Sequence, residues 1–181
     1  SIPLTEDRPG MDRMICRLPD MNDEAIVRGY VQEHYDHGAE HIYASCRLAT
    51  TPYGEWVGKI RRCAREGEGA SGRSLVLLCF DGERLVGLLS VRYELPRELS
   101  ESIGDIGYGV RPTERRKGYA TAMLRHALDI CREKGKTSVI VGCYKDNEAS
   151  AATIRKCGGV FIYESDNYTR GRPSLYFRID L

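Results

Sequence analysis

Apolar positions recur along the chain with two spacings, one typical of helices and one typical of strands. The clearest helical stripe follows residue 118 and should end at Gly135, a good C-terminal cap; it comprises Ala120, Met123, Leu124, Ala127, Leu128 and Cys131. Residues 74–80 instead form a continuous apolar run. Asp81-Gly82 follows them, and this dipeptide is a strong signal for a hairpin. Together these patterns predict an amphipathic helix and a buried hairpin.

Weaker patterns predict the remaining elements. A helix should begin near Asn22 or Asp23, which are good N-cap residues, and another should start at Asn147 and end at Gly158-Gly159. A further helix is expected over residues 52–65. Strands are expected at residues 14–18, 85–93, 106–110, 137–143, 160–163 and 175–179, and loops at residues 65–73 and 96–105.

The order of these elements predicts the fold class. Two helices precede an antiparallel meander of three strands, and then helix, strand, helix, strand and strand follow. This order indicates a mixed α/β sheet flanked by helices, in a single domain of residues 1–181. The connection changes from hairpin to crossover at residues 110–118, and open sheets tend to bind ligands where the strand pattern changes.

Composition narrows the class of partner and the compartment. The chain has 27 Lys and Arg against 26 Asp and Glu, for a net charge of +1, which argues against nucleic acid or an anionic membrane as a partner. Its seven cysteines are odd in number and include no C-x-x-C pair, so we expect free, mostly buried thiols in a reducing compartment. The sequence shows neither a signal peptide nor an apolar run of membrane-spanning length. We therefore expect a cytoplasmic protein.

The segment between the third strand and the strong helix carries the most specific chemistry. A basic loop of Arg115, Arg116 and Lys117 leads into the start of the helix, where unpaired N–H groups favour an anion. Gly118 lets the backbone approach a ligand closely. The segment thus predicts a pyrophosphate site, with a solvated basic turn as the plain alternative. The sequence contains neither G-x-x-x-x-G-K-[ST] nor G-x-G-x-x-G after this strand, which disfavours a P-loop or a Rossmann site.

Two blocks of the sequence resemble the GNAT superfamily of N-acyltransferases. Val110-Arg111-Pro112 followed by Arg115-x-x-Gly118-x-Ala120 resembles its acetyl-CoA signature, Q/R-x-x-G-x-G/A. The segment from Asn147 to Ser150 resembles its second conserved block, and element order agrees over residues 75–181. The sequence around the first block also resembles that of a group of bacterial acetyltransferases whose substrates are generally unassigned. The resemblance implies direct transfer of acetyl from acetyl-CoA to a primary amine of a small molecule or peptide, in a ternary complex and without a metal.

The resemblance also implies roles for individual residues. Backbone amides from Arg116 to Thr121 would hold the pyrophosphate, and the strand from Tyr108 to Val110 would pair with the pantetheine arm. The Val110 N–H would donate to the thioester carbonyl, and Gly107 and Gly109 suit a bulge or a close backbone approach. The full cofactor set is Tyr108, Gly109, Val110, Arg115, Arg116, Lys117, Gly118, Tyr119, Ala120, Thr121, Asn147 and Ser150.

The acid and the base are less clear. Many members carry a tyrosine, as acid to the leaving thiolate, at the position that Ile154 occupies here. Asp105 is the first candidate for the general base and Glu94 is the second, although both acids also suit an ordinary surface role. A non-catalytic acyl-CoA-binding or regulatory module is therefore the rival hypothesis, and a homodimer is compatible with either.

Two polar clusters have open roles, and the acceptor amine remains unnamed. The cluster of His34, His37 and His41 suits a metal site, a polar helix end, or contact with the acceptor together with Tyr35. Another cluster suits either the acceptor side or plain hairpin decoration; it comprises Tyr163, Tyr168, Arg170 and Arg172.

Overall fold

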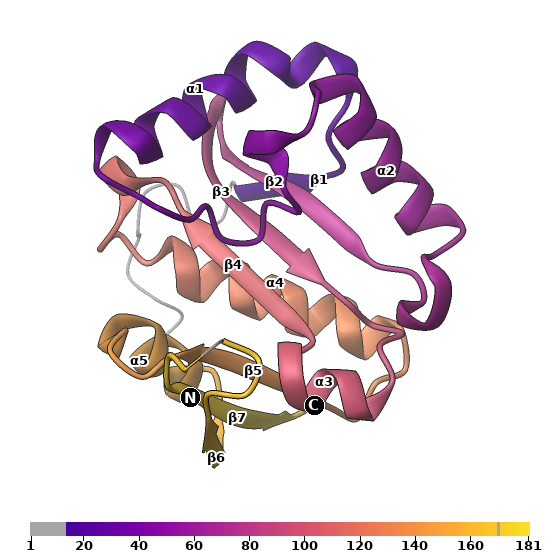
Figure 1. The fold of residues 1–181 in the computed structure, drawn as a ribbon, viewed down its shortest axis with the longest axis vertical. Helices are drawn as coiled ribbons and strands as arrows, with labels where there is room; N and C mark the ends of the chain where they lie inside the picture. The colour runs from indigo at the N-terminus through magenta and orange to yellow at the C-terminus, as the bar shows by residue number, and fades with distance from the viewer. Residues whose placement is uncertain (1–13, 170) are drawn as a thin grey trace, which may run out of the picture.

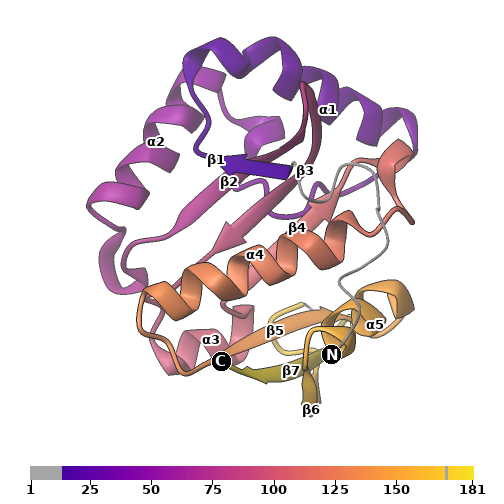
Figure 2. The same cartoon turned by 180° about the vertical axis from the view of Figure 1, so that it is seen from behind.

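The computed structural model describes residues 14–169 and 171–181, in which five helices and seven strands form (Figures 1 and 2). The helices are α1 (Glu24–Asp36), α2 (Tyr53–Arg65), α3 (Arg97–Ile103), α4 (Tyr119–Glu133) and α5 (Glu148–Lys156). The strands are β1 (Met14–Arg17), β2 (Leu75–Asp81), β3 (Arg84–Val91), β4 (Ile106–Val110), β5 (Ser138–Tyr144), β6 (Val160–Ser165) and β7 (Ser174–Asp180).

The strands form two sheets that meet at β4 and β5. One sheet has the order β1-β2-β3-β4, and the other has the order β5-β7-β6. At the start of β4 the Asp105 N–H donates to the Ile140 carbonyl of β5 at 2.7 Å, and the Ile140 N–H donates to the Asp105 carboxylate at 2.7 Å. Farther along, β4 and β5 belong to different sheets and their backbones diverge, and we call the space between the two backbones the gap (Figure 1). The predicted mixed α/β class is confirmed.

The larger sheet is covered on both faces. Helices α1 and α2 lie on one face, over a cluster that includes Leu78, Leu88 and Trp56 (Figure 1). Helix α4 lies on the other face, where its predicted apolar stripe packs with Leu89 and with side chains of the smaller sheet (Figure 2). This arrangement places the start of α4 beside the end of β4, at the end where the backbones of β4 and β5 diverge.

Several predicted boundaries are confirmed and one is corrected. Gly135 and Gly158 follow the ends of α4 and α5 with φ of +83° and +96°. A 3-10 turn at Met21–Asp23, with a capping box of Asp20 and Asp23, leads into α1, whose N-cap is Asp23, as predicted. Residues 96–105 are not all loop, because α3 forms between Pro96 and Gly104. Pro suits a helix start and Gly a helix end, so both ends of α3 were legible in the sequence.

Of the two roles predicted for Gly107 and Gly109, a bulge or a close backbone approach, the pairing of β4 with β3 shows no bulge. The register of β3 and β4 runs without a shift from Gly87 opposite Val110 to Val91 opposite Ile106. Gly109 serves the alternative role of close approach. A Cβ atom there would lie 3.1 Å from the Tyr43 carbonyl oxygen, in the segment between α1 and α2. That segment therefore crosses the sheet directly over β4 (Figure 1).

Candidate functional site

The connection from β4 to α4 is shaped by left-handed backbone. Arg116 has φ of +64° and Gly118 has φ of +89°, with Lys117 between them. Arginine rarely adopts this conformation, whereas glycine does so at little cost. Left-handed residues within such a turn direct successive N–H groups toward one side and create an anion-binding concavity.

Main-chain donors in this turn have no acceptor of their own. Among the described residues, no hydrogen bond is donated by the amides from Arg116 to Thr121, which we call the amide loop. The Ala122 N–H is the first to join the helix, donating to the Gly118 carbonyl at 3.2 Å. No side chain caps α4. The amide loop therefore presents its free donors, together with the positive end of the helix dipole, beside the end of β4.

The side chains of the turn, in contrast, are largely engaged with the protein. Lys117 Nζ lies 2.9 Å from the Glu114 carboxylate, which is also paired with Arg84 at 2.5 Å. The Tyr119 hydroxyl donates to Asp81 at 2.5 Å, and burial raises the pKa of Tyr119 to about 12. Arg116 and Arg115 are exposed. The main-chain amides of the turn are therefore more available to a ligand than most of its side chains.

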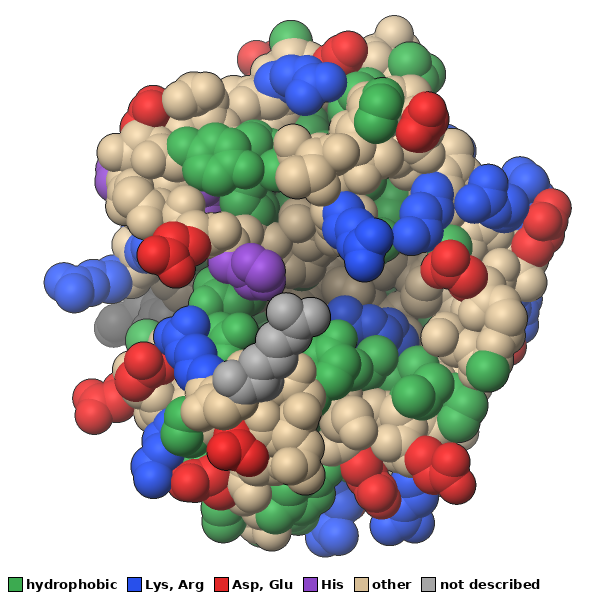
Figure 3. Space-filling model, viewed as in Figure 1, with side chains coloured by type: hydrophobic (Ala, Val, Ile, Leu, Met, Phe, Trp, Pro, Cys, Tyr) green, Lys and Arg blue, Asp and Glu red, His purple; other side chains and the backbone are tan. Residues whose placement is uncertain are grey.

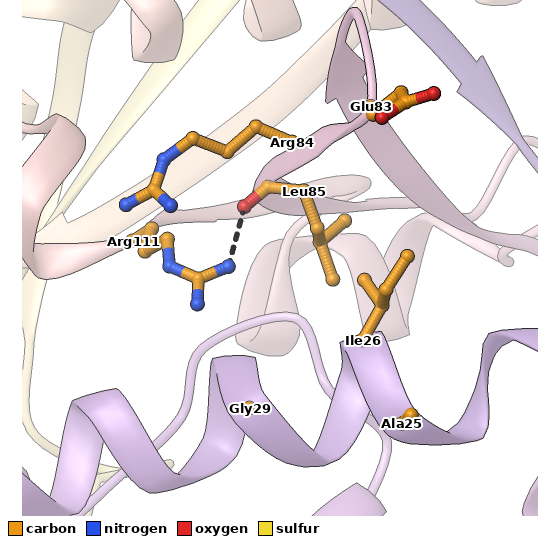
Figure 4. A pocket seen from close by; sticks show the side chains of 7 residues that line it. All are labelled: Ala25, Ile26, Gly29, Glu83, Arg84, Leu85 and Arg111. Carbon is orange, nitrogen blue, oxygen red and sulfur yellow. Dashed lines mark hydrogen bonds between the residues drawn. The ribbon is translucent and has the colours of Figure 1, made fainter.

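Arg111 is a structural residue in this arrangement. Its Nη1 donates to the Leu85 carbonyl at 2.9 Å, and its Nε lies 3.1 Å from the Glu33 carboxylate of α1. Figure 4 shows Arg111 and Arg84 beside a lateral cavity of about 370 Å³, with Gly29 and Ile26 of α1 on its other side. Burial opposes ionisation of Glu33, but hydrogen bonds from Arg111 and Thr113 outweigh it and lower the pKa of Glu33. Arg111 therefore ties α1 to the end of β4.

The strand β4 turns some of its amides toward the gap. In an antiparallel pair, successive residues point their N–H groups alternately toward the partner strand and away from it. The Arg111 N–H donates to Val86 of β3 at 2.8 Å. The alternation then directs the amides of Tyr108 and Val110 away from β3, toward the gap that separates β4 from β5.

Residues from α5 close the other side of the gap. The Tyr108 hydroxyl lies 2.8 Å from Ser150 Oγ, and burial raises the pKa of Tyr108 to about 12. Asn147 caps α5, because its side chain accepts from the Ser150 N–H at 3.1 Å. Ile154 is fully buried, so it leaves no polar group where the superfamily's tyrosine would stand. Tyr43 spans the gap from above, with its ring centre 6.2 Å from that of Tyr144.

Asp105 and Glu94 are engaged elsewhere. Asp105 is 2 % exposed, and its carboxylate accepts from Ser100 Oγ at 2.5 Å and from the Ile140 N–H. It joins the two sheets at the closed end of the gap, about 16 Å from Val110 at the usual rise per residue. Glu94 is held by Arg73 at 2.9 Å, which lowers its pKa, and it lies beyond the end of β3. These positions argue against both acids as general bases.

A central cavity of about 620 Å³ lies on the α1–α2 face of the larger sheet. The segment between α1 and α2 forms one wall, and Ser90 and Arg92 belong to its floor. Figure 3 shows this face of the molecule hollowed near its centre, with basic side chains along the hollow. The sequence did not reveal the cavity, because its walls come from segments far apart in the chain. The signal it did contain was two polar residues on an otherwise apolar strand face.

The histidine cluster is dispersed. His34 is buried, and its Nδ1 lies 2.8 Å from the Tyr30 carbonyl, whereas His37 is exposed. His41 lies beyond α1 and lines the central cavity together with Tyr35. Within residues 14–169 and 171–181, no group of three or more His, Cys, Asp or Glu side chains is arranged to hold a metal ion.

The second polar cluster is divided as well. Tyr168 lines the central cavity, whereas the Tyr163 ring stacks on Tyr176 and its hydroxyl donates to the Glu101 carbonyl. Arg172 lies over the Tyr144 ring at 3.6 Å, and Arg170 lies outside the described residues. One cluster member thus faces the cavity and another supports the smaller sheet.

The structure also describes the state of the cysteines and the length of the helices. All seven cysteines are free, and Cys63, Cys79 and Cys131 are buried while Cys46 is exposed. Among the helices of the described residues, none has both the length and the apolar character that crossing a membrane requires.

Comparison with protein families finds one match. A family model described as "Acetyltransferase (GNAT) family" matches residues 39–159, which include β4, the amide loop and α5. No curated protein matches the sequence.

Solved structures share the fold at low sequence identity. The putative acetyltransferase yncA from Salmonella typhimurium, solved with acetyl-CoA, has a TM-score of 0.65 at 16% identity, covering 93% of this chain and 94% of that chain. The microcin C7 self-immunity acetyltransferase MccE, solved with acetyl-CoA and AMP, has a TM-score of 0.69 at 14% identity, with coverages of 94% and 93%. RimL, a ribosomal L7/L12 alpha-N-protein acetyltransferase, has a TM-score of 0.67 at 17% identity, with coverages of 97% and 94%.

Proposed function

We propose, from the premise that this chain belongs to the GNAT family of acetyltransferases, that it transfers the acetyl group of acetyl-CoA directly to a primary amine within a ternary complex. The observation that carries the proposal is the row of free amides from Arg116 to Thr121 at the start of α4, beside the gap between β4 and β5. A pyrophosphate supplies the acceptors that this row lacks.

The cofactor would extend from the amide loop along β4. With its pyrophosphate at the loop, the pantetheine arm would enter the gap and pair with the free amide of Val110, which brings the thioester near the free amide of Tyr108. The central cavity approaches β4 at Gly107, which is opposite Ser90 of the cavity floor. We therefore assign the Val110 amide to the arm and move the proposed oxyanion donor to the Tyr108 amide. Asn147 and Ser150 would border the arm from α5.

The acetyl transfer needs no covalent intermediate with the enzyme. The neutral amine attacks the thioester carbonyl, the oxyanion of the tetrahedral intermediate accepts a hydrogen bond from the Tyr108 N–H, and the C–S bond then breaks. The amine proton passes to a base on the cavity side, and the thiolate takes a proton. Tyr43 is our candidate for the acid that protonates the thiolate, because its ring spans the gap. Burial raises the pKa of Tyr43, which keeps its hydroxyl protonated. A Tyr43→Phe variant with the wild-type rate would remove it from this role.

Calorimetric titration with acetyl-CoA tests the proposal, followed by thiol release across a panel of amines. We expect saturable binding at micromolar to millimolar cofactor and thiol release that depends on the amine. Absence of binding in this range would contradict the proposed cofactor. Binding without release for any amine would leave a cofactor-binding module instead of an active transferase.

The acceptor differs among the structural neighbours. MccE is named for immunity to microcin C7, and RimL is named for the alpha-amino group of a ribosomal protein. These names do not transfer to this chain at such low identity. The acceptor has to be inferred from the residues of the central cavity.

A further inference from the structure

The floor of the central cavity breaks the apolar pattern of β3. Leu88 and Ser90 of β3 and Arg92, the first residue after the strand, lie on the same face, because side chains two residues apart in extended backbone share a face. Leu88 is fully buried under the helices, whereas Ser90 and Arg92 line the cavity. A strand face directed toward a core rarely carries arginine unless the guanidinium is paired, so we looked for the group that Arg92 binds.

Among the described residues, the Arg92 side chain makes a hydrogen bond to one group, a main-chain carbonyl. Its Nη1 donates to the Gly104 carbonyl at 3.1 Å. Among the described residues, no carboxylate lies within 4.0 Å of its guanidinium. A guanidinium has five N–H donors, so most of its donors remain for a ligand. Burial lowers the pKa of Arg92, because the cavity floor is poorly hydrated and the charge is not compensated by an ion pair.

The acids near Arg92 are committed elsewhere or lie at other parts of the cavity. Asp105, which lies opposite Arg92 just before β4, is bonded to Ser100 and to the Ile140 amide. Glu68 lies 3.9 Å from Lys59. Glu40 and Glu68 line other parts of the cavity, and Arg47 adds a second cation. The floor is thus cationic while the cavity as a whole carries both signs.

The floor lies close to the proposed reacting atoms. Ser90 is opposite Gly107, and Arg92 is one step farther along the same face, about 7 Å at the usual strand rise. A methyl group built on Gly107 would contact only Ser90 Cβ, at 3.9 Å, so this part of the floor is open. An amine held at Gly107 could therefore place an attached anion at Arg92.

We propose that the acceptor is a small primary amine that carries an oxyanion, either a carboxylate or a phosphate, and that the Arg92 guanidinium binds this oxyanion. The inference rests on the proposed acetyltransferase function, and it names the substrate class of that site. A cavity of about 620 Å³ accommodates an amino acid or a short peptide end.

The test compares amines that differ only in their anion. Amino acids are paired with their carboxamides, and phosphoethanolamine is paired with ethanolamine; tyramine and spermidine complete the panel. We expect kcat/KM to favour the anionic member of a pair by about 10- to 100-fold, the range for a hydrogen-bonded charge. The carboxylate and phosphate pairs distinguish the two sources of the anion.

Arg92→Gln should abolish this preference by lowering kcat/KM for the anionic amine alone. Arg97→Gln, at an exposed arginine of α3 that does not line the cavity, is the matched control, and Arg92→Lys should restore part of the preference. Acetyl-CoA affinity, measured for each variant, should stay at the wild-type value. If Arg92 only holds the Gly104 carbonyl, Arg92→Gln will lower the melting temperature and affect both members of a pair equally, which overturns the inference.

Other outcomes separate this inference from the proposed function. Faster acetylation of tyramine or spermidine than of every anionic amine overturns the inference and leaves an acetyltransferase. A protein that binds acetyl-CoA but acetylates none of the panel also overturns it. Failure to bind acetyl-CoA at all removes the proposed function, and the inference falls with it.

Discussion

The amide loop and the central cavity differ in which parts of the chain form them. The amide loop is one continuous segment, and its donors are main-chain groups whose direction is set by two left-handed residues, Arg116 and Gly118. The cavity is built from the side chains of segments that lie far apart in the sequence, and its charge comes from residues such as Arg92. A site made of backbone tolerates change in its side chains, whereas a site made of side chains can change its ligand with a few substitutions. The difference predicts a constant donor site beside a variable acceptor site.

The largest expected effect is on acetyl-CoA affinity, and it tests whether the backbone or the side chains of the amide loop bind the cofactor. Gly118→Ala places a methyl group at φ of +89°, where the backbone is proposed to approach the pyrophosphate. We expect acetyl-CoA affinity to fall at least about tenfold, because the displaced turn loses charge-assisted hydrogen bonds. Calorimetric titration measures the change.

Gly135→Ala is the matched control, since its φ of +83° imposes similar strain and a Cβ there meets no atom within 4 Å. Both variants should lose about 1–2 kcal/mol of stability, but Gly135→Ala should bind acetyl-CoA normally. Arg116→Gly keeps the left-handed turn and should bind within about fivefold of the wild type, as expected for an exposed charge. Equal losses in Gly118→Ala and Gly135→Ala would contradict a backbone site.

The next effect concerns β4, which the two sites share. A methyl group on Gly109 would lie 3.1 Å from the Tyr43 carbonyl and 3.2 Å from Tyr43 Cβ. Gly109→Ala should therefore shift the segment over β4 and lower the free energy of unfolding by about 1–3 kcal/mol, measured by urea denaturation.

Gly107→Ala is the companion variant on the same strand face. Its methyl group would enter open space beside Ser90, so stability should stay within about 0.5 kcal/mol of the wild type. Its effect should be on the KM of the acceptor, with acetyl-CoA affinity preserved. If Gly107→Ala weakened cofactor binding more than acceptor binding, the boundary between the two sites would be misplaced.

The smallest expected effect is a pH dependence of the free energy of unfolding, caused by His34 of α1. Burial lowers the pKa of His34 below its ordinary value of about 6.5. The unfolded chain therefore binds the proton more readily than the folded chain. The free energy of unfolding should fall as pH drops below about 6.5, and should level off below the folded pKa. Urea denaturation at pH values on both sides of about 6.5 measures this slope.

His34→Gln should remove that slope, whereas His37→Gln should retain it. The two residues make the same contact, from Nδ1 to the carbonyl four residues earlier, at 2.8 Å and 2.9 Å. They differ in burial, since His34 is 3 % exposed and His37 is exposed. A slope that survives in His34→Gln would assign the pH dependence to another group.

Predictions from the sequence succeeded where the signal is local. The apolar stripe of α4, its closing Gly135 and the N-cap at Asn147 depend on neighbouring residues, and the structure agrees with each. The position of the basic turn between β4 and α4 was legible for the same reason. The helix α3 was missed although Pro96 and Gly104 mark its ends, because its polar residues resemble a loop.

Predictions failed where a residue's role depends on distant partners. Asp105 looked like a free acid at the start of a strand, yet its carboxylate bonds to Ser100 and to the Ile140 amide of another sheet. Gly109 suited a bulge equally well until Tyr43 was found above it. Neither the bond to Ile140 nor the contact with Tyr43 has a signature in the nearby sequence.

The sequence by itself determined the order of the elements, the amphipathic helix and the anion-binding turn, because local periodicity, capping and backbone conformation depend on residues close in the chain. Only the tertiary structure decided which acids are buried, which amides of β4 face the gap, and how Arg92 comes to lie in a cavity floor with no ion pair to any of the described residues. Those properties depend on burial and on partners from remote segments, which spacing along the chain does not encode.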